Sequence, residues 1–251
     1  MVKMLGVIGR RPDLSHAQFV KHQLTTHLEV VDRVPEFRNR VRRYAQNHLF
    51  VDPSELTLIK SLSVCVDTDS IIEVWWDSVA DMRRAFEEPR YLEIIRPDEL
   101  SFGDVAGVWG VATQDTLITE RWGFSGLIKI FCFLKRKDII GHSEFLSRWR
   151  DCCDRRLTSA HAFCKLAGRF VENVVAQDPG KSLPGTRAFD VVAELWFESL
   201  LHVAEFTADP DVIAAMTGED TDFMDRTQTL IYVAEEKPAA AEWFRKGQAC
   251  T

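Results

Sequence analysis

The sequence predicts an α+β protein made of two copies of one β-α-β-β-α-β unit. Three observations predict it: the chain repeats itself, each half alternates short apolar strands with amphipathic helices, and one strand phrase occurs twice. The phrase reads DSIIEVWW at residues 69–76 and DVVAELWF at residues 190–197. A length of 251 residues is enough for one large or two small units with real cores.

The repeat extends through almost the whole chain at two offsets. Lys3 aligns with Lys129 at an offset of 126 (129 − 3), and this alignment needs no gap as far as the second strand. Beyond a longer loop in the first copy the offset falls to 121 (190 − 69), which aligns the two strand phrases. We therefore expect a first repeat at residues 1–120 and a second at residues 121–251, joined near TERWGFSG at residues 119–126.

Each element of the first repeat has its own sequence signature. The long helix has Ser15 as a cap, with Gln18 three residues later, and ends before Pro35. The expected strands are residues 3–9, 42–50, 70–77 and 105–112, and the expected helices are residues 15–34 and 81–89. This order is that of a ferredoxin-like unit, an antiparallel sheet with both helices on one face. The other face of the sheet needs a cover.

The strand phrase indicates what covers that face. Successive side chains of a strand point to opposite faces, so Val74 and Trp76 belong under the helices while Glu73 and Trp75 face the open side. If the open faces of both repeats close on each other, the chain forms an intramolecular dimeric α/β barrel. We expect a pocket inside this barrel, lined by the acids and indoles of both phrases.

Composition excludes several classes of function. The net charge is −7 and no basic stripe occurs, so we expect no nucleic-acid partner. The six cysteines form no CxxC pair and no His/Cys ligand set, which predicts neither a metal site nor a disulfide framework. Without a signal peptide or a membrane-spanning run, we expect a soluble, cytoplasmic protein with a small aromatic molecule as its partner.

Several motifs together resemble a known family. The first helix carries FxxxxxxxHxxxVxxxP, the second strand reads YAQNH, and the pattern D-x-x-x-E-[VL]-W-[WF] precedes an AF-x-x-P turn. In this order the motifs resemble the EthD-domain group of the dimeric α+β barrel superfamily, here duplicated in tandem. The resemblance implies relatives that include cofactor-free cyclases, isomerases, dehydratases, decarboxylases and oxygenases, together with haem-binding members and stress-response proteins.

The two copies depart from the family pattern in different ways. Family members commonly carry a tryptophan four residues after the helix phenylalanine and a histidine eight residues after it. The first copy has Gln23 and His27 at these positions, whereas the second has Trp149 and Cys153. The resemblance therefore implies one working cavity, with the second copy kept as scaffold or reshaped for binding.

Candidate site residues follow from what such a cavity could do. His27 is the first candidate for general acid or base, followed by Glu73 and Glu194. The candidate substrate-binding residues are Tyr44, Asn47, His48, Trp75, Phe131 and Trp196. Tyr44 and His48 share one face of their strand and Asn47 takes the other, so only one of these sets can reach the pocket. The two glutamates could equally pair with Arg10, Arg136 or Lys129 in a structural salt bridge across the barrel.

The expected function is that of a cofactor-independent enzyme. Proton transfer on an aromatic or polyketide-like carbonyl compound would make it a lyase (dehydratase or decarboxylase), an isomerase or a cyclase, in secondary metabolism or aromatic catabolism. The alternatives are a cofactor-free oxygenase of aromatic substrates and a non-catalytic binding or stress module. We expect no cofactor, with haem as the weaker option. Because the duplication supplies the second half of the barrel, the chain can act as a monomer or form a homodimer.

Overall fold

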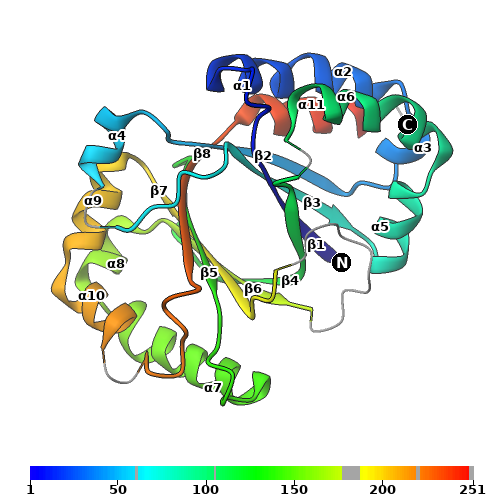
Figure 1. The fold of residues 1–251 in the computed structure, drawn as a ribbon. Coiled ribbons are helices and arrows are strands. Elements are labelled where there is room, and N and C mark those ends of the chain that lie inside the picture. Colours follow the sequence, from blue (N-terminus) through cyan, green and yellow to red (C-terminus); the bar gives the residue numbers. More distant parts are fainter. Residues whose placement is uncertain (60–61, 105, 177–186, 219–220, 249–251) are drawn as a thin grey trace.

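Eight strands close into an antiparallel barrel, with all helices on the outside (Figure 1). The computed structural model describes residues 1–59, 62–104, 106–176, 187–218 and 221–248. The strands are β1 (Val2–Ile8), β2 (Arg43–Leu49), β3 (Ser70–Trp76), β4 (Trp109–Glu120), β5 (Ile128–Leu134), β6 (Arg169–Val175), β7 (Val191–Phe197) and β8 (Leu230–Glu236). The α+β class and the closed barrel agree with the sequence-based prediction.

The helices form two groups on opposite sides of the barrel (Figure 1). The first group comprises α1 (His16–Leu24), α2 (Thr26–Asp32), α3 (Pro35–Arg38), α5 (Val79–Phe86), the π-helix η1 (Tyr91–Ile95), α6 (Arg96–Phe102) and the C-terminal α11 (Pro238–Gln248). The second comprises α4 (Pro53–Leu58), α7 (His142–Cys152), the π-helix η2 (Cys153–Leu157), α8 (His161–Leu166), α9 (Leu200–Ala208) and α10 (Pro210–Thr217). Among the described residues, no helix has the length and apolar composition that a membrane crossing needs.

The strand order β1-β3-β2-β8-β5-β7-β6-β4 explains how the barrel closes. Strand β4 pairs with β1 from its own half of the chain and with β6 from the other half. In the same way, β8 pairs with β5 and with β2. The last strand of each half therefore joins the two halves, and no strand edge of the barrel is left open.

The predicted alternation along β3 is confirmed. Val74 and Trp76 belong to the apolar cluster beneath the first group of helices, while Glu73 and Trp75 are buried inside the barrel. In β7, Glu194 likewise lies inside the barrel and Leu195 under the helices.

The structure corrects three expected boundaries. The predicted helix at residues 15–34 is broken at Thr25, whose hydroxyl donates a hydrogen bond to the Lys21 carbonyl at 2.8 Å. A threonine hydroxyl that bonds back to the preceding turn bends a helix, and a second β-branched residue follows here. The fourth strand begins at Trp109 and extends to Glu120, into the predicted joint, while Val105 of the expected strand lies outside the described residues. The long loop between the second and third strands contains α4.

The C-terminal helix α11 has no counterpart in the sequence-based prediction. It follows β8, a strand of the second half, yet packs against β2 of the first half. Its Trp243 and Phe244 join the apolar cluster beneath the first group of helices. A segment from the end of the chain therefore covers the sheet near its beginning.

Candidate functional site

The interior of the barrel is filled by a buried network of ion pairs. The Lys3 ammonium lies 2.5 Å from a carboxylate oxygen of Glu73 and 2.5 Å from one of Glu194. Lys129, the counterpart of Lys3, pairs with Glu73 and lies 2.8 Å from Glu236. All four side chains of the two lysines and the two phrase glutamates are about 1% exposed or less. The salt-bridge alternative is therefore the one that the structure shows for the glutamates, with Lys3 as an unpredicted partner.

Other side chains that were expected to line a pocket complete this network. Asn47 donates a hydrogen bond to Glu73 at 2.8 Å, and the Trp75 indole donates to Asp115 at 2.9 Å. The Trp196 indole donates to Glu236 at 3.2 Å, and Phe131 is fully buried in the barrel's apolar cluster. An eight-stranded barrel is just wide enough for its side chains to fill it. The expected pocket inside the barrel is therefore wrong, because the side chains from both halves meet in its interior.

The two glutamates of the network have opposite pKa shifts. For Glu73, burial would raise the pKa, but Lys129 and Lys3 outweigh it and hold the pKa well below its usual range. For Glu194, burial and the nearby Glu73 charge raise the pKa to about 7. With Glu236, three carboxylates share two ammonium groups, so the last carboxylate to ionise resists losing its proton.

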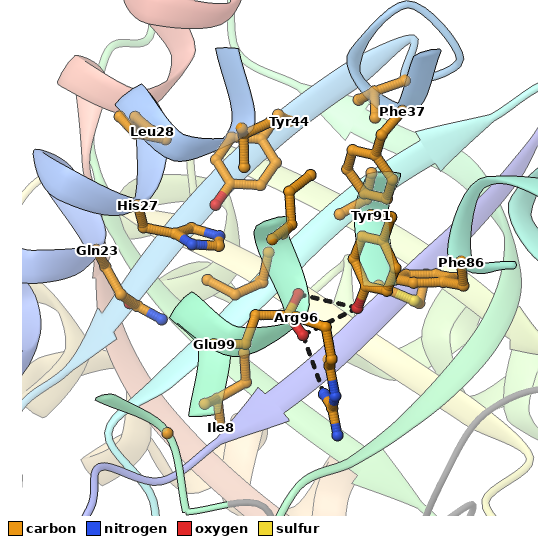
Figure 2. Close-up of a pocket in the computed structure, with 18 of the residues that line it drawn as sticks. Ile8, Gln23, His27, Leu28, Phe37, Tyr44, Phe86, Tyr91, Arg96 and Glu99 are labelled. Carbon is orange, nitrogen blue, oxygen red and sulfur yellow. Dashed lines mark hydrogen bonds and ion pairs between the residues drawn. The ribbon is translucent and has the colours of Figure 1, made fainter. Parts of the chain in front are cut away.

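A cavity of about 380 Å³ lies on the outer side of the sheet, beneath the first group of helices (Figure 2). Its walls come from β1, β2, β3 and β4 below and from α1, α2, α3, α5, η1, α6 and α11 above. The lining is mainly apolar and includes Met4, Val31, Val74, Phe86, Ile95 and Phe244. An apolar hollow of this size with a few polar groups is typical of small-molecule sites.

His27 lies in the wall of this cavity and is held by a carboxylate. Its Nδ1 is 2.7 Å from Asp98, whose other oxygen is 2.8 Å from Nε2 of His22. Both histidine rings pack against Phe102, at centroid distances of 5.2 and 4.8 Å. Burial would raise the pKa of Asp98, but hydrogen bonds from His27 and His22 outweigh it and lower the pKa. An ionised Asp98 accepts the proton on Nδ1, which leaves the Nε2 lone pair of His27 available as a base.

A second polar group lies on β2 at the floor of the cavity, where Tyr44 belongs to the lining. The Tyr44 hydroxyl accepts a hydrogen bond from Gln46 at 2.8 Å, and His48 lies 2.9 Å from Gln23 on α1. Burial raises the pKa of Tyr44 far above its usual value, so the hydroxyl keeps its proton for donation. The choice that periodicity left open is thereby resolved: Tyr44 and His48 face the helices, and Asn47 faces the barrel interior.

A third polar cluster forms another wall of the cavity, and its side chains bond to one another (Figure 2). The Tyr91 hydroxyl lies 2.9 Å from Glu99, which also accepts a hydrogen bond from Arg96 at 2.9 Å. Arg96 is about one third exposed, which places this cluster toward solvent. Its charges are already paired with each other, so this cluster shapes the cavity wall.

The corresponding space in the second half is packed with side chains. Trp149 and Cys153 occupy the positions of Gln23 and His27, and both are buried. Together with Phe163 and Phe170 they belong to one apolar cluster beneath the second group of helices. Burial raises the pKa of the Cys153 thiol far above its usual value, which keeps the thiol neutral and inert.

The remaining basic candidates have structural partners of their own. Arg10 and His16 both bond to Asp69, at 2.5 and 2.8 Å. In the second half, Arg136 and His142 bond to Asp190 in the same arrangement. These paired clusters anchor the end of the first strand of each half, and they lie apart from the barrel's ion pairs.

Sequence reasoning missed Asp98, the partner that orients His27. The two residues are 71 positions apart, and no spacing connects an aspartate on α6 to a histidine on the distant helix α2. One feature of the sequence could have drawn attention to Asp98. It follows Pro97 at the start of a helix, where acidic residues are common. Gln23 was noted only as a departure from the family pattern.

One family model matches part of the chain. Residues 11–106 match the EthD domain, in agreement with the resemblance seen in the motifs. A search of the curated proteins finds no match to the chain.

Similar solved structures share the fold across nearly the whole chain. An anthrone oxidase-like protein superposes with a TM-score of 0.59 at 9% identity, covering 94% of this chain and 91% of that one. A candidate monooxygenase of Fusobacterium nucleatum gives 0.54 at 5% identity, covering 94% and 91%. A chlorite dismutase variant from Candidatus Nitrospira defluvii gives 0.52 at 10% identity, covering 98% and 94%.

These names correct the expected reaction class. The neighbours are described as a monooxygenase, an anthrone oxidase-like protein and a chlorite dismutase, which are oxidative or oxygen-handling activities. The expectation of a cofactor-free lyase, isomerase or cyclase is therefore not supported. The oxygenase alternative agrees better with the comparisons.

Proposed function

We propose that the cavity in the first half is the active site of a cofactor-independent oxygenase, which oxidises an aromatic, carbonyl-containing compound with O₂. One observation carries the proposal: a mainly apolar cavity has in its wall a histidine whose Nδ1 is held by an ionised aspartate. The names of the anthrone oxidase-like and monooxygenase neighbours support the class of reaction and of substrate. Anthrones are acidic aromatic ketones, so a single base can start their oxidation.

The reaction balances without a cofactor. Nε2 of His27 removes a proton from the activated carbon or hydroxyl group of the substrate, which leaves an electron-rich, delocalised anion. The anion transfers one electron to O₂, and the two radicals combine to form a carbon–oxygen bond. The protonated His27 returns its proton to the resulting peroxide, and loss of water leaves a new carbonyl. One O₂ is thereby consumed for each quinone and each water formed.

The cavity supplies the environment for this sequence. Its apolar walls exclude water and hold a flat ring system, while the Tyr44 hydroxyl can donate a hydrogen bond to a substrate oxygen. Asp98 keeps the imidazole in one orientation and stabilises the imidazolium that forms. The base and the donor come from α2 and β2, two elements that the apolar core holds rigidly.

The size of this cavity argues against a haem site. A porphyrin needs a broad slot, whereas about 380 Å³ is near the small end of the range for small-molecule sites. In the second half, Trp149 and its neighbours fill the corresponding space. We therefore propose that the enzyme uses no haem, and a Soret band in the purified protein would contradict this.

We also propose that the barrel consists of two fused ferredoxin-like repeats, residues 1–120 and 121–251. Support comes from the strand order within each half and from the paired positions of Lys3 and Lys129 in the interior. Because one chain covers both sheet faces, the protein can act as a monomer. Sedimentation at low concentration tests this.

Oxygen uptake with a dihydroxyanthrone tests the proposed activity. Wild-type protein should consume O₂ and form the matching dihydroxyanthraquinone faster than the enzyme-free background. His27→Ala should lower this rate by about 10²–10⁴-fold, the usual contribution of a general base. His161→Ala, the same change at an exposed histidine outside the cavity, is the matched control. Equal rates for wild type and His27→Ala would remove His27 from the mechanism.

A further inference from the structure

Gln23 is a buried polar side chain in the wall of the cavity. It lies near the end of α1, is 1% exposed and contributes to the cavity lining. Its main-chain carbonyl accepts a hydrogen bond from Gln46 at 3.1 Å, and its side-chain oxygen lies 2.9 Å from Nε2 of His48. Both ends of the residue are therefore fixed by side chains of β2.

The state of His48 decides how the Gln23 amide is oriented. Burial, with the Lys237 charge in second place, lowers the pKa of His48 to about 3, so its ring is neutral and carries one proton. Its Nδ1 is buried and has no hydrogen-bond partner among the described residues. A buried N–H without an acceptor is rarer than a buried acceptor without a donor, so the proton belongs on Nε2. His48 then donates to the Gln23 oxygen.

This leaves the Gln23 amide nitrogen for the cavity. The side chain points into the cavity in Figure 2, and its nitrogen has no hydrogen-bond partner within the described part of the chain. A ligand that covers this donor without offering an acceptor leaves it buried and unpaired, which costs about 1–3 kcal/mol, whereas a ligand with an acceptor at this point avoids that cost.

The second half lacks both members of this pair. At an offset of 126 (149 − 23 and 174 − 48), Gln23 corresponds to Trp149 and His48 to Val174. The half whose space is packed carries an indole and an aliphatic side chain, and the half with the cavity carries an amide and the imidazole that orients it. The polar pair therefore accompanies the cavity and is not a general requirement of the fold.

We infer that Gln23 is a specificity-determining residue, whose side-chain amide donates a hydrogen bond to a carbonyl or enolate oxygen of the aromatic ligand, and that His48 positions it. The inference rests on the proposed function only for the class of ligand. A donor at the carbonyl oxygen selects oxygenated ring systems over plain hydrocarbons. It also stabilises the anion that forms when His27 removes a proton.

Binding without turnover tests this inference. The probes are a dihydroxyanthraquinone and the matching dihydroxyanthracene, which has the same ring system but no carbonyl. From the cost of an unpaired donor, the wild-type protein should bind the quinone about 5–150-fold more tightly, as measured by fluorescence titration. In amide-labelled protein, the Gln23 side-chain NMR signal, assigned by its loss in Gln23→Leu, should shift with the quinone only.

Three variants distinguish a Gln23 amide that His48 orients toward the ligand from a Gln23 side chain that only fills space. Gln23→Leu should abolish the preference for the quinone, and His48→Val should reduce it by freeing the amide to rotate. The double variant Gln23→Leu/His48→Val removes both polar groups, so it leaves no unpaired partner and keeps the fold, as circular dichroism should show. Gln114→Leu makes the same change at an exposed position and should behave as wild type.

The outcomes distinguish this inference from the proposed function. An unchanged preference for the quinone in folded Gln23→Leu, or failure of the wild-type protein to bind either probe, overturns the inference. If the preference follows Gln23 but no variant consumes O₂ with the anthrone, the inference holds and the oxygenase proposal fails. If O₂ uptake depends on His27 while Gln23 has no effect on selectivity, only the inference fails.

Discussion

Asp98 is the residue that orients His27, the proposed base. It bonds to His27 through one oxygen and to His22 through the other, and its lowered pKa keeps it ionised. Without this acceptor the imidazole could rotate or take the other tautomer, and Nε2 would no longer be fixed as the free base.

Asp98→Asn should therefore lower kcat for anthrone oxidation while leaving the ligand affinity nearly unchanged. A hydrogen bond to a charged group contributes about 1.5–3 kcal/mol, which corresponds to about 10–100-fold in rate. Steady-state kinetics measure kcat and KM separately. A large rise in KM with constant kcat would show that Asp98 shapes the cavity and does not act through His27.

At the residue scale, the sequence predicted which face of a strand each side chain takes, but it did not predict which residues pair with each other. Strand alternation placed Glu73 inside the barrel and Val74 under the helices, because the two-residue period of a strand is local. It did not predict that Lys3 and Lys129 would neutralise Glu73, because this pairing brings residues from both halves together. The catalytic roles of Glu73 and Glu194 depended on an open interior that these lysines fill.

At the scale of elements, the helical segments α1–α2 and α7–η2 determine which half contains the cavity. In the first half the helix breaks at Thr25, so Gln23 and His27 come from two helices that border the cavity. In the second half α7 continues directly into the π-helix η2, and Trp149 points into the core. The family pattern predicted that the halves differ, but not that the cavity lies beneath the helices, because periodicity shows which face is apolar and not whether it is fully packed.

Gln23→Trp should reproduce in the first half the packing found in the second. The indole is expected to occupy the cavity and to abolish quinone binding. Its added apolar burial opposes the cost of leaving His48 without its Gln23 partner, so the melting temperature should change little. Fluorescence titration and thermal melting measure the two effects. Wild-type affinity in a folded Gln23→Trp protein would mean that the ligand binds elsewhere.

At the scale of the whole molecule, the barrel interior links both halves through buried charges. The elevated pKa of Glu194 means that the folded state holds a proton that the unfolded state releases. The unfolded state then binds fewer protons between the ordinary pKa and about 7, so stability from this group falls as the pH rises through that interval. Glu73 and Glu236 have lowered pKa values, so their contributions are lost only at more acidic pH.

Glu194→Gln should therefore flatten the dependence of the unfolding free energy on pH between about pH 5 and pH 8. Wild-type protein is expected to lose stability over this interval, as measured by denaturant titration at several pH values. Glu236→Gln is the matched control, because the lowered pKa of Glu236 places its effect below this range. The same slope in wild type and Glu194→Gln would show that Glu194 is ionised throughout.

The overall architecture was the most predictable level, because local sequence patterns reveal both the repeat and the order of the strands. The C-terminal helix α11 was not predicted, because it packs on β2, a strand almost 200 residues earlier in the chain. This helix contributes Trp243 and Phe244 to the cavity wall. The candidate site therefore needs the C-terminal helix and is not formed by the first 120 residues alone.

Oxidation of a dihydroxyanthrone under isotopically labelled O₂ tests the central claim most directly. The account predicts that wild-type protein, above the enzyme-free background, places one labelled oxygen atom in each quinone, as seen by mass spectrometry. It also predicts that Gln23→Trp, with its cavity filled, reduces this labelling to the background rate. Unlabelled quinone from the wild-type protein, or undiminished labelling by folded Gln23→Trp, would contradict an oxygenase site in the first-half cavity.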